Sequence, residues 1–320
     1  MKRSVLVLAG LVSLAGQAER ARAGFLTLND PQAIYGTYAS GINGGKIVGY
    51  YENGAAGTHG FVYDGTTYTT LNDPLALQTL AYGISGSNIV GTFYDAAGAH
   101  GFLYDGTTYK SLNEPLGVHT YAYGISGSNV VGAYYDGTNY HGFVYDGTTY
   151  TTLDVPGGVN TNAFGISGGK VVGSYFSGGA LHGFVYDGTS YTTLNDPLGA
   201  RTFAYGISGS TIVGRYDSGL GDAHGFVYDG STFRTLDDPL GPGATVAQGV
   251  DGTSIVGYYS DAGGTHGFLY QPDVTATPAP SSLLLGGLGS TMGFAFLGWR
   301  RLRQLAMLRA SPFPARMTAE

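Results

Sequence analysis

An all-β fold built from six copies of one unit is predicted by three features of the sequence. The first is a repeated His-Gly-Phe triplet with intervals of 41, 41, 41, 42 and 42 residues, beginning at His59, His100, His141, His182, His224 and His266. The second is a composition in which 56 Gly residues accompany many Tyr, Phe, Val, Ile and Thr residues, as suits short strands joined by tight turns. The third is the return, in every copy, of a Gly-Ile or Gly-Val pair and an Ile/Val-Val-Gly triplet. A fixed internal period of this kind indicates units that pack on their neighbours.

One copy, residues 120–156, illustrates the expected strands. Four short apolar segments predict strands a to d, at Tyr121–Ile125, Val130–Tyr135, His141–Tyr145 and Tyr150–Leu153. Turn-forming Gly, Asn and Asp residues separate them, and the Asp-Gly pair after strand c is a strong hairpin signal. A proline ends the copy, because proline cannot donate to a continuing ladder. Four short antiparallel strands per copy match the size of one β-propeller blade.

Both faces of each predicted sheet are apolar. Strand c carries Phe143 on one side and Val144 on the other, whereas a sheet with one wet face would alternate apolar and polar residues. The ends of the array complement each other, since Phe25–Leu28 resembles a strand d without its strand c and His266–Tyr270 a strand c without its strand d. We therefore predict a six-bladed β-propeller over residues 24–271, closed by the N-terminal strand, with a β-solenoid as the alternative.

The N-terminal residues 1–23 are typical of a secretory signal peptide. Basic residues at positions 2 and 3 precede an apolar run, and the small residues Ala21 and Ala23 lie just before Gly24, the expected first residue of the mature chain. The repeats are therefore expected to be exported, to the cell surface or beyond it.

The C-terminal part predicts a membrane or sorting helix. A Pro/Thr/Ala-rich linker at 272–280 leads into an uncharged run at 281–299, which is long enough to cross a bilayer core as a helix. The tail at 300–320 opens with a cluster of Arg residues, which by the positive-inside rule predicts a cytoplasmic C-terminus. At least a transient anchor in the inner membrane is expected.

The order of features in this C-terminal part resembles the PEP-CTERM sorting signal of Gram-negative bacteria. Pro278-Ala279-Pro280 comes first, then the apolar run, then the Arg cluster, although Ala279 stands where that family has Glu and the tail continues to Glu320. The resemblance implies processing by an exosortase-type enzyme and an association with exopolysaccharide and biofilm. An ordinary C-terminal membrane anchor is the alternative.

The repeat itself resembles the HAF-type bacterial extracellular repeat. The likeness rests on the His-Gly-Phe triplet with its strand, and on the preceding Ala-x-Gly-Ile and Val-Val-Gly segments, over Phe25–Tyr270. Gly replaces that family's Ala in all six triplets. The resemblance implies an exported repeat protein and implies no reaction.

Composition excludes several classes of partner and site. Residues 24–273 contain 20 acidic and 6 basic residues, so a nucleic-acid partner is not expected, because such binding depends on Lys and Arg neutralising phosphates. The chain has no Cys, which excludes disulfides, thiolate metal sites and a Cys nucleophile.

The six repeat histidines have two interpretations. A ring of imidazoles could bind a metal ion, but equivalent positions of a propeller stand far apart away from the axis. We favour a structural hydrogen bond from each His to a blade carboxylate such as Asp73 or Asp105, and predict no metal site. The recurrent Asp-Gly pairs lack the alternating Asp spacing of a calcium loop, so no cofactor is expected, with calcium as the open alternative.

Candidate ligand residues come from the positions at which the copies differ. The residue just before the Thr of strand a varies, and Gln78, His119, Asn160 and Arg201 give it polar character. Variable loops on a constant scaffold are common binding sites, and polar groups beside Tyr and Phe suit sugars. Neutral drift in exposed loops would produce the same pattern.

No Gly-x-Ser-x-Gly elbow, zincin helix or phosphate-binding loop occurs in the sequence, so no catalytic residues and no enzyme are predicted. We expect an exported, non-enzymatic protein of the cell surface or matrix that binds extracellular polysaccharide or a surface protein. The alternatives are a purely structural repeat module and a polysaccharide hydrolase or lyase.

Overall fold

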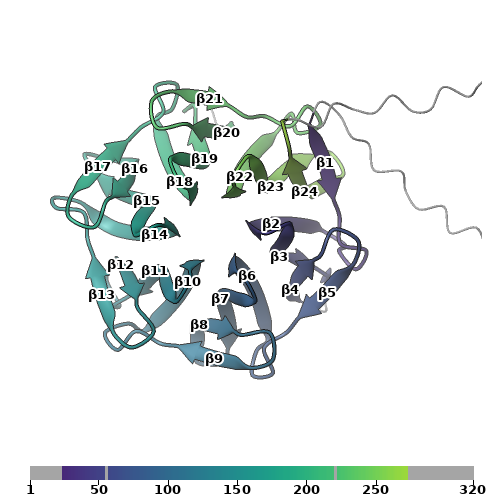
Figure 1. Ribbon diagram of the computed structural model, residues 1–320, viewed down its shortest axis with the longest axis horizontal. Helices are drawn as coiled ribbons and strands as arrows, with labels where there is room; N and C mark the ends of the chain where they lie inside the picture. Colours follow the sequence, from purple (N-terminus) through teal and green to yellow (C-terminus); the bar gives the residue numbers. More distant parts are fainter. Residues whose placement is uncertain (1–23, 55–56, 220–221, 273–320) are drawn as a thin grey trace, which may run out of the picture. The chain divides into compact units, whose positions relative to one another are not determined.

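The computed structural model describes residues 24–54, 57–219 and 222–272. They form a ring of six four-stranded antiparallel blades around a central axis (Figure 1). The predicted signal peptide at 1–23, the rest of the linker after residue 272, the helix at 281–299 and the tail at 300–320 lie outside these residues. Within the described ranges, no helix is long and apolar enough to cross a membrane.

The strands follow one another from the axis outwards in every blade. Blade 1 consists of β2 (Gly36–Asn43), β3 (Lys46–Glu52), β4 (Thr58–Tyr63) and β5 (Tyr68–Leu71). Blade 2 consists of β6 (Gln78–Ser85), β7 (Asn88–Asp95), β8 (Gly98–Tyr104) and β9 (Tyr109–Leu112). Blade 3 consists of β10 (His119–Ser126), β11 (Asn129–Tyr135), β12 (Tyr140–Tyr145) and β13 (Tyr150–Leu153).

The second half of the ring repeats this order. Blade 4 consists of β14 (Val159–Ser167), β15 (Lys170–Ser177), β16 (Ala180–Tyr186) and β17 (Tyr191–Leu194). Blade 5 consists of β18 (Arg201–Ser208), β19 (Thr211–Asp217), β20 (Ala223–Tyr228) and β21 (Phe233–Thr235). Blade 6 consists of β22 (Ala244–Asp251), β23 (Ser254–Asp261), β24 (Gly264–Tyr270) and, from the other end of the chain, β1 (Phe25–Leu28).

The pairing of β1 with β24 confirms the predicted closure. The two strands are antiparallel, with Phe25 opposite Tyr270 and Leu28 opposite Gly267. The Phe25 ring lies 5.3 Å from that of Phe268 and 4.7 Å from that of Tyr270, so the N-terminal strand also completes the core of blade 6. A ring closed in this way leaves no open end to cap, and the solenoid alternative is wrong.

The core of each blade is the Phe of the His-Gly-Phe triplet. All six of these side chains are fully buried: Phe61, Phe102, Phe143, Phe184, Phe226 and Phe268. In blade 3 the Phe143 ring packs over Gly132 of β11, where an added Cβ would lie 2.7 Å from the ring and collide with the Tyr121 carbonyl. Neighbouring blades share their cores, since Val90 of blade 2 packs with Phe143 of blade 3. This stacking explains the two apolar faces of each sheet.

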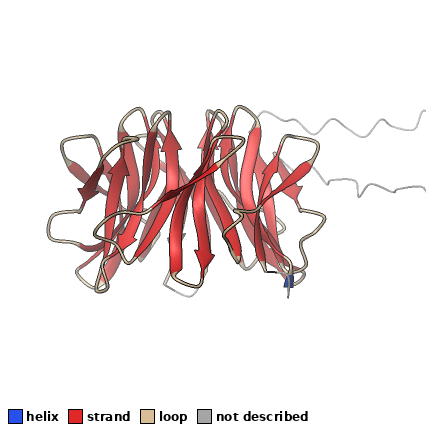
Figure 2. Cartoon of the chain, turned by 90° about the horizontal axis from the view of Figure 1, so that it is seen from below, coloured by secondary structure: helices blue, strands red, loops and turns tan. Residues whose placement is uncertain are grey.

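The blades expose different connections at the two ends of the axis (Figure 2). The d–a and b–c connections form what we call the loop face, and the a–b and c–d turns form the turn face. On the loop face, the Thr of each strand a accepts a hydrogen bond of 2.9–3.2 Å from a backbone amide of the preceding loop: Thr37, Thr79, Thr120, Thr161, Thr202 and Thr245. The invariant Thr is therefore explained by loop anchoring.

The packing of Phe143 on glycine can be tested by the variant Gly132→Ala. The new methyl group must displace both the Tyr121 carbonyl and the Phe143 ring, so we expect the free energy of unfolding in urea to be about 1–3 kcal/mol lower than that of the parent protein. The matched control is Gly243→Ala on the loop face, where the nearest atom to an added Cβ is 3.5 Å away. A stability loss equal to that of this control would contradict the packing argument.

Candidate functional site

The repeat histidines bind their own blades. In every blade, Nδ1 of the His meets a side-chain oxygen of a residue one or two positions after strand d, at 2.8–3.2 Å: Asn72, Asn113, Asp154, Asn195, Asp237 and Asn29. The predicted bond to a carboxylate is present where this residue is Asp, in blades 3 and 5, but the two aspartates named as examples, Asp73 and Asp105, are not the partners. His59 pairs with Asn72 rather than Asp73, and the acceptors of His100 are Asn113 and Asp95 rather than Asp105.

The second nitrogen of several of these rings is also occupied. Nε2 lies 3.2 Å from a carboxylate oxygen of the b–c loop in three blades and 3.1 Å from a backbone carbonyl in a fourth: Asp95, Asp136, Asp261 and Ser177. Among the described residues, no group of three or more His, Asp and Glu side chains is arranged to hold a metal ion.

The recurrent Asp-Gly pairs form tight c–d turns. Asp146 Oδ1 accepts hydrogen bonds from the Thr148 and Thr149 amides and from the Thr148 hydroxyl, and its Oδ2 accepts one from the Thr149 hydroxyl. The Thr149 amide and the other donors hold the pKa of the Asp146 carboxyl well below its usual range. Turn chemistry alone therefore accounts for these aspartates.

The four predicted ligand residues lie at the start of strand a in blades 2 to 5, around the loop-face end of the axis: Gln78, His119, Asn160 and Arg201. Two of them bind the neighbouring blade, because His119 Nδ1 accepts the Ala99 amide at 3.3 Å and Asn160 Oδ1 accepts the Tyr140 amide at 3.0 Å. Gln78 and Arg201 are exposed. The four positions therefore share one place in their blades, on the loop face, and two of them link neighbouring blades.

A narrow neck in the axial channel was missed by the sequence analysis. The six strands a approach the axis at a glycine, where an added Cβ would lie 2.6–2.8 Å from a carbonyl oxygen of the next blade: Gly41, Gly83, Gly124, Gly165, Gly206 and Gly249. The register shifts just before each glycine, so the preceding residue forms a β-bulge. We call these six bulge residues the neck ring: Ser40, Tyr82, Tyr123, Phe164, Tyr205 and Gln248.

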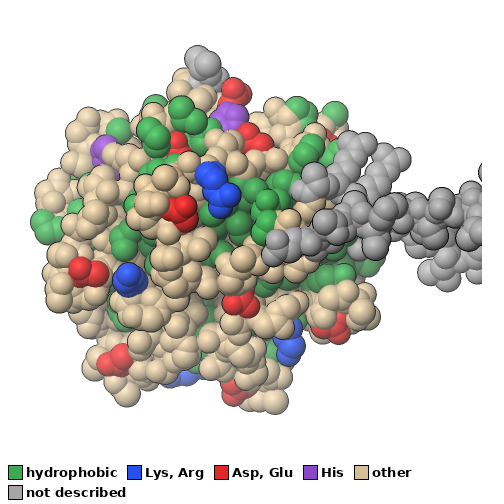
Figure 3. Space-filling model, turned by 45° about the horizontal axis from the view of Figure 1, so that its top comes forward, with side chains coloured by type: hydrophobic (Ala, Val, Ile, Leu, Met, Phe, Trp, Pro, Cys, Tyr) green, Lys and Arg blue, Asp and Glu red, His purple; other side chains and the backbone are tan. Residues whose placement is uncertain are grey.

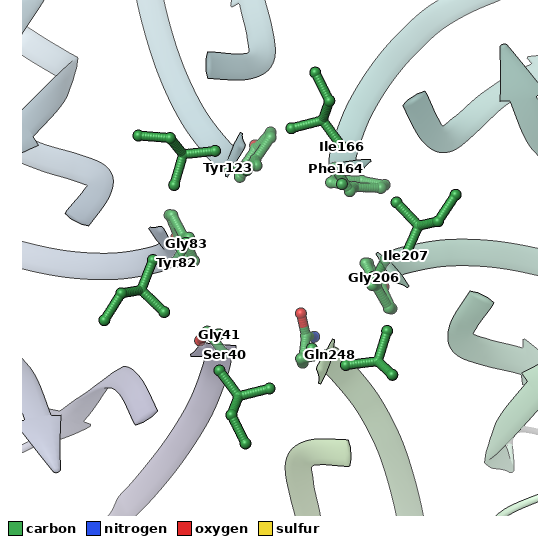
Figure 4. A pocket seen from close by; sticks show the side chains of 18 residues that line it. Ser40, Gly41, Tyr82, Gly83, Tyr123, Phe164, Ile166, Gly206, Ile207 and Gln248 are labelled. Atoms are coloured by element: carbon green, nitrogen blue, oxygen red, sulfur yellow. The ribbon is translucent and has the colours of Figure 1, made fainter. Parts of the chain in front are cut away.

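The neck ring is aromatic on one side and polar on the other. Each aromatic ring packs on the next, with centroids 5.4 Å apart for Tyr82 and Tyr123, 5.1 Å for Tyr123 and Phe164, and 5.0 Å for Phe164 and Tyr205. Ser40 and Gln248 complete the circle around an open centre (Figure 4). The cavity here has a volume of about 220 Å³.

The aromatic wall continues from the neck towards the loop face. Tyr121 is nearly parallel to Tyr123 at 6.1 Å, and Phe203 to Tyr205 at 6.0 Å. In this second layer each blade presents a facing pair from strands a and b, which we call the pair layer: Tyr38 and Tyr50, Leu80 and Thr92, Tyr121 and Ala133, Asn162 and Ser174, Phe203 and Arg215, Val246 and Tyr258. No two blades carry the same pair.

Two buried polar atoms of the pair layer have no hydrogen-bond partner, namely Thr92 Oγ1 and Arg215 Nε. Asp217 Oδ1 is 3.5 Å from this Nε, which makes an ion pair but not a hydrogen bond. Unsatisfied buried polar atoms are uncommon in proteins, and one explanation for them is a bound molecule.

The phenols of the neck ring stay neutral at ordinary pH. Burial raises the pKa of Tyr82, Tyr123 and Tyr205 well above the usual value, although the charge of Arg215 partly opposes this at Tyr205. A neutral phenol can both donate and accept a hydrogen bond.

A second hollow, of about 870 Å³, lies on the loop face at the seam between blades 6 and 1. Asp30 borders it, with Oδ1 accepting the Gln32 amide at 2.8 Å and Oδ2 buried without a partner. The same turn recurs at Asp73, Asp196 and Asp238, so its first role is to hold the d–a loop.

The loop face also carries exposed apolar side chains. They follow the Pro of the d–a loops, and the Leu at one equivalent position is 66–71% exposed in three blades: Leu75, Leu116 and Leu198. Figure 3 shows hydrophobic side chains near the middle of one face, with a basic and an acidic side chain beside them, and further hydrophobic side chains towards its edge.

Comparison with known proteins adds only general similarity. No protein-family model matches the chain, and no curated protein matches it. Solved structures that resemble it include a fucose-recognising six-bladed lectin from Aleuria aurantia (14% identity, 77% of this chain and 99% of that chain, TM-score 0.44). Others are the propeller domain of a trilobed protease from Pyrococcus furiosus (10%, 74% and 94%, 0.49) and TolB from Acinetobacter baumannii (14%, 71% and 64%, 0.48). Such distant likeness transfers no ligand and no activity.

The histidine contacts predict a pH-dependent stability in blade 3. Burial lowers the pKa of His141, but the hydrogen bonds and charges of Asp154 and Asp136 outweigh it and raise the pKa above 6.5. A raised pKa in the folded state stabilises below the unfolded value, and this contribution disappears as pH rises through the folded pKa. The variant His141→Gln should therefore lose up to about 1 kcal/mol more stability at about pH 5.5 than at about pH 8.5.

Thermal and urea unfolding of both proteins at the two pH values measures this difference. The matched control is His59→Gln, because the partner of His59 is the neutral amide of Asn72. Replacing His59 removes no ion pair, so the stability lost by this variant should differ less between the two pH values than that lost by His141→Gln. An equal pH dependence in both variants would disprove the role of the two carboxylates.

Proposed function

We propose that this protein is an exported, non-enzymatic propeller that binds carbohydrate in its axial channel. The observation that carries the proposal is the neck ring, in which four aromatic side chains face two polar ones across one cavity. Sugars have apolar C–H faces that pack on aromatic rings, and hydroxyl rims that need hydrogen bonds. Binding pockets generally combine apolar walls with a few well-placed polar groups in this manner.

The size of the cavity limits the ligand. Its volume of about 220 Å³ is below the roughly 300–1,000 Å³ common for small-molecule pockets. One sugar ring or the end of a chain fits such a space better than an oligosaccharide lying flat. The residue after each neck glycine also lines this cavity and adds an apolar ring to it: Ile42, Ile84, Ile125, Ile166, Ile207 and Val250.

The residues of the neck support binding rather than catalysis. Its side chains are hydroxyl, phenol, amide and hydrocarbon groups, and burial keeps the phenols protonated. A general base needs a pKa near the working pH, which none of these groups offers.

The proposed location follows the terminal signals of the sequence. A signal peptide at 1–23 and a sorting or anchoring helix at 281–299 would carry the propeller out of the cytoplasm and hold it, at least transiently, at the inner membrane. We propose processing by an exosortase-type enzyme and an association with extracellular polysaccharide and biofilm.

A second candidate function is docking on a surface protein. The exposed Leu75, Leu116 and Leu198 of the loop face favour it, because exposed apolar side chains that cluster often mark protein contacts. In that case the loop face, rather than the neck, would carry the binding.

The variant Tyr123→Ser tests the carbohydrate proposal. Ser40 occupies the equivalent position of blade 1, so the fold accommodates this residue. Loss of one aromatic wall should weaken binding about tenfold in calorimetric titrations against a glycan panel and the host's own polysaccharide. The titrations are made with and without calcium, because calcium was the alternative to a protein without a cofactor.

The loop-face variants Arg201→Ala and His119→Ala provide the comparison. A large effect of these and none of Tyr123→Ser would move the site from the neck to the loop-face opening. If the parent protein binds no member of the glycan panel, carbohydrate binding is refuted. Shortening of the polysaccharide with time would instead support the hydrolase or lyase alternative.

A further inference from the structure

We propose that the axial channel selects sugars that carry a carboxylate, and that Arg215 is the residue that recognises this group. The inference deepens the proposed function and rests on it, since it names the chemical class of sugar that the channel takes. Blade 5 differs from the other five blades in that its residue pair in the pair layer contains a charged side chain.

Arg215 is a charged exception in the pair layer. At its position in strand b the other blades carry neutral residues: Tyr50, Thr92, Ala133, Ser174 and Tyr258. The repeat itself therefore does not require a cation here. A half-buried charge is costly unless it is paired, and in this blade Asp217 supplies one counter-charge, with Oδ1 3.5 Å from the Arg215 Nε.

The guanidinium is held in place by aromatic side chains. Its Cζ lies 4.5 Å from the centroid of the Phe203 ring, and Phe203 is parallel to Tyr205 of the neck ring. Its charge also acts on the phenol of Tyr258 in the next blade. Stacking of this kind orients an Arg side chain before any ligand arrives.

The protein leaves hydrogen-bonding capacity on this group unused. Asp217 approaches Nε only to 3.5 Å, and the buried Nε has no hydrogen-bond partner. The Nε atom itself is buried, but the Arg215 side chain as a whole is 29% exposed, so an incoming group can reach the exposed part of the guanidinium side chain. A guanidinium offers five N–H donors in a planar fork that matches the two oxygens of a carboxylate.

The surrounding charge restricts the ligand further. Residues 24–273 contain 20 acidic and 6 basic residues, so the propeller as a whole would repel a polymer with many negative charges. One carboxylate on a sugar ring, close to the neutral phenols of Tyr205 and Tyr258, avoids this repulsion. The expected ligand is therefore a chain end or an isolated residue that is a uronic acid.

The test compares pairs of methyl glycosides that differ only at C6, such as a glucuronide with a glucoside and a galacturonide with a galactoside. The purified full chain is titrated with each member by calorimetry. We expect the acidic member to bind roughly 10–100-fold more tightly, as a charge-assisted bidentate contact would give.

The variant Arg215→Ser should abolish this preference, so that the acidic and the neutral member of each pair bind with similar affinity. Ser174 occupies the position in blade 4, so the fold accommodates the change. The double variant Arg215→Ser with Asp217→Ser guards against an effect of leaving Asp217 unpaired. Arg215→Lys keeps the charge without the planar fork and should retain only part of the preference.

The matched control is Arg234→Ser, which removes the same charge from an exposed position on the outer strand β21. It should preserve the preference for the acidic glycoside. If the parent protein binds both members of each pair equally and Arg215→Ser changes neither affinity, the inference is overturned while carbohydrate binding stands. If no glycoside binds at all, the proposed function fails together with the inference.

Discussion

The close approach of six strands at the axis is the constraint on which the rest of this structure depends. At Gly124 and its five equivalents, the backbone of one blade lies against a carbonyl oxygen of the next, with no room for a Cβ. Glycine in a strand is otherwise unfavourable, so its recurrence at this place reflects the narrowness of the ring. A bulge directly before each glycine accommodates the turn of the strand and aims one side chain at the channel.

This geometry separates residues that carry the fold from residues that are free to differ. The buried Phe143, the Gly132 beneath it and the Thr120 that anchors the loop each serve a contact that recurs in all six blades. The bulge residue faces the channel instead of a neighbouring sheet, so packing does not dictate its identity. Ser40 and Tyr123 can therefore occupy equivalent positions in one ring.

The sequence predicted the architecture well because the repeat supplied independent copies of each signal. Strand d of blade 3 has the predicted bounds Tyr150–Leu153, and strands a to c differ only by one or two residues at their ends. The complementary half-blades at the two termini predicted the pairing of β1 with β24, which the structure confirms. Hydrophobic pattern and turn chemistry were sufficient for this level of description.

Side-chain partners were harder to predict, because they depend on register to within one residue. His59 bonds Asn72, whereas the adjacent Asp73, which the sequence suggested as a histidine partner, accepts the Leu75 amide within the d–a loop. The bulges are the reason that the neck ring was not predicted. A variable residue inside the constant Ala-x-Gly-Ile segment was the available signal, but its direction follows from a local register shift that no hydrophobic period encodes.

The distribution of satisfied and unsatisfied polar groups favours the channel over its loop-face opening as the seat of binding. His119 and Asn160 already accept backbone amides from the neighbouring blade, so a ligand would have to compete with those bonds. Arg215 Nε and Thr92 Oγ1 have no such partners, and each unsatisfied buried group costs about 1–3 kcal/mol. Both atoms are buried out of reach of a bound molecule, whereas the Arg215 side chain as a whole is 29% exposed and can be approached without displacing a backbone hydrogen bond of the repeat. Arg215, the one charged residue of the pair layer, is thus the side chain there that can make a charge-assisted contact with an anionic ligand.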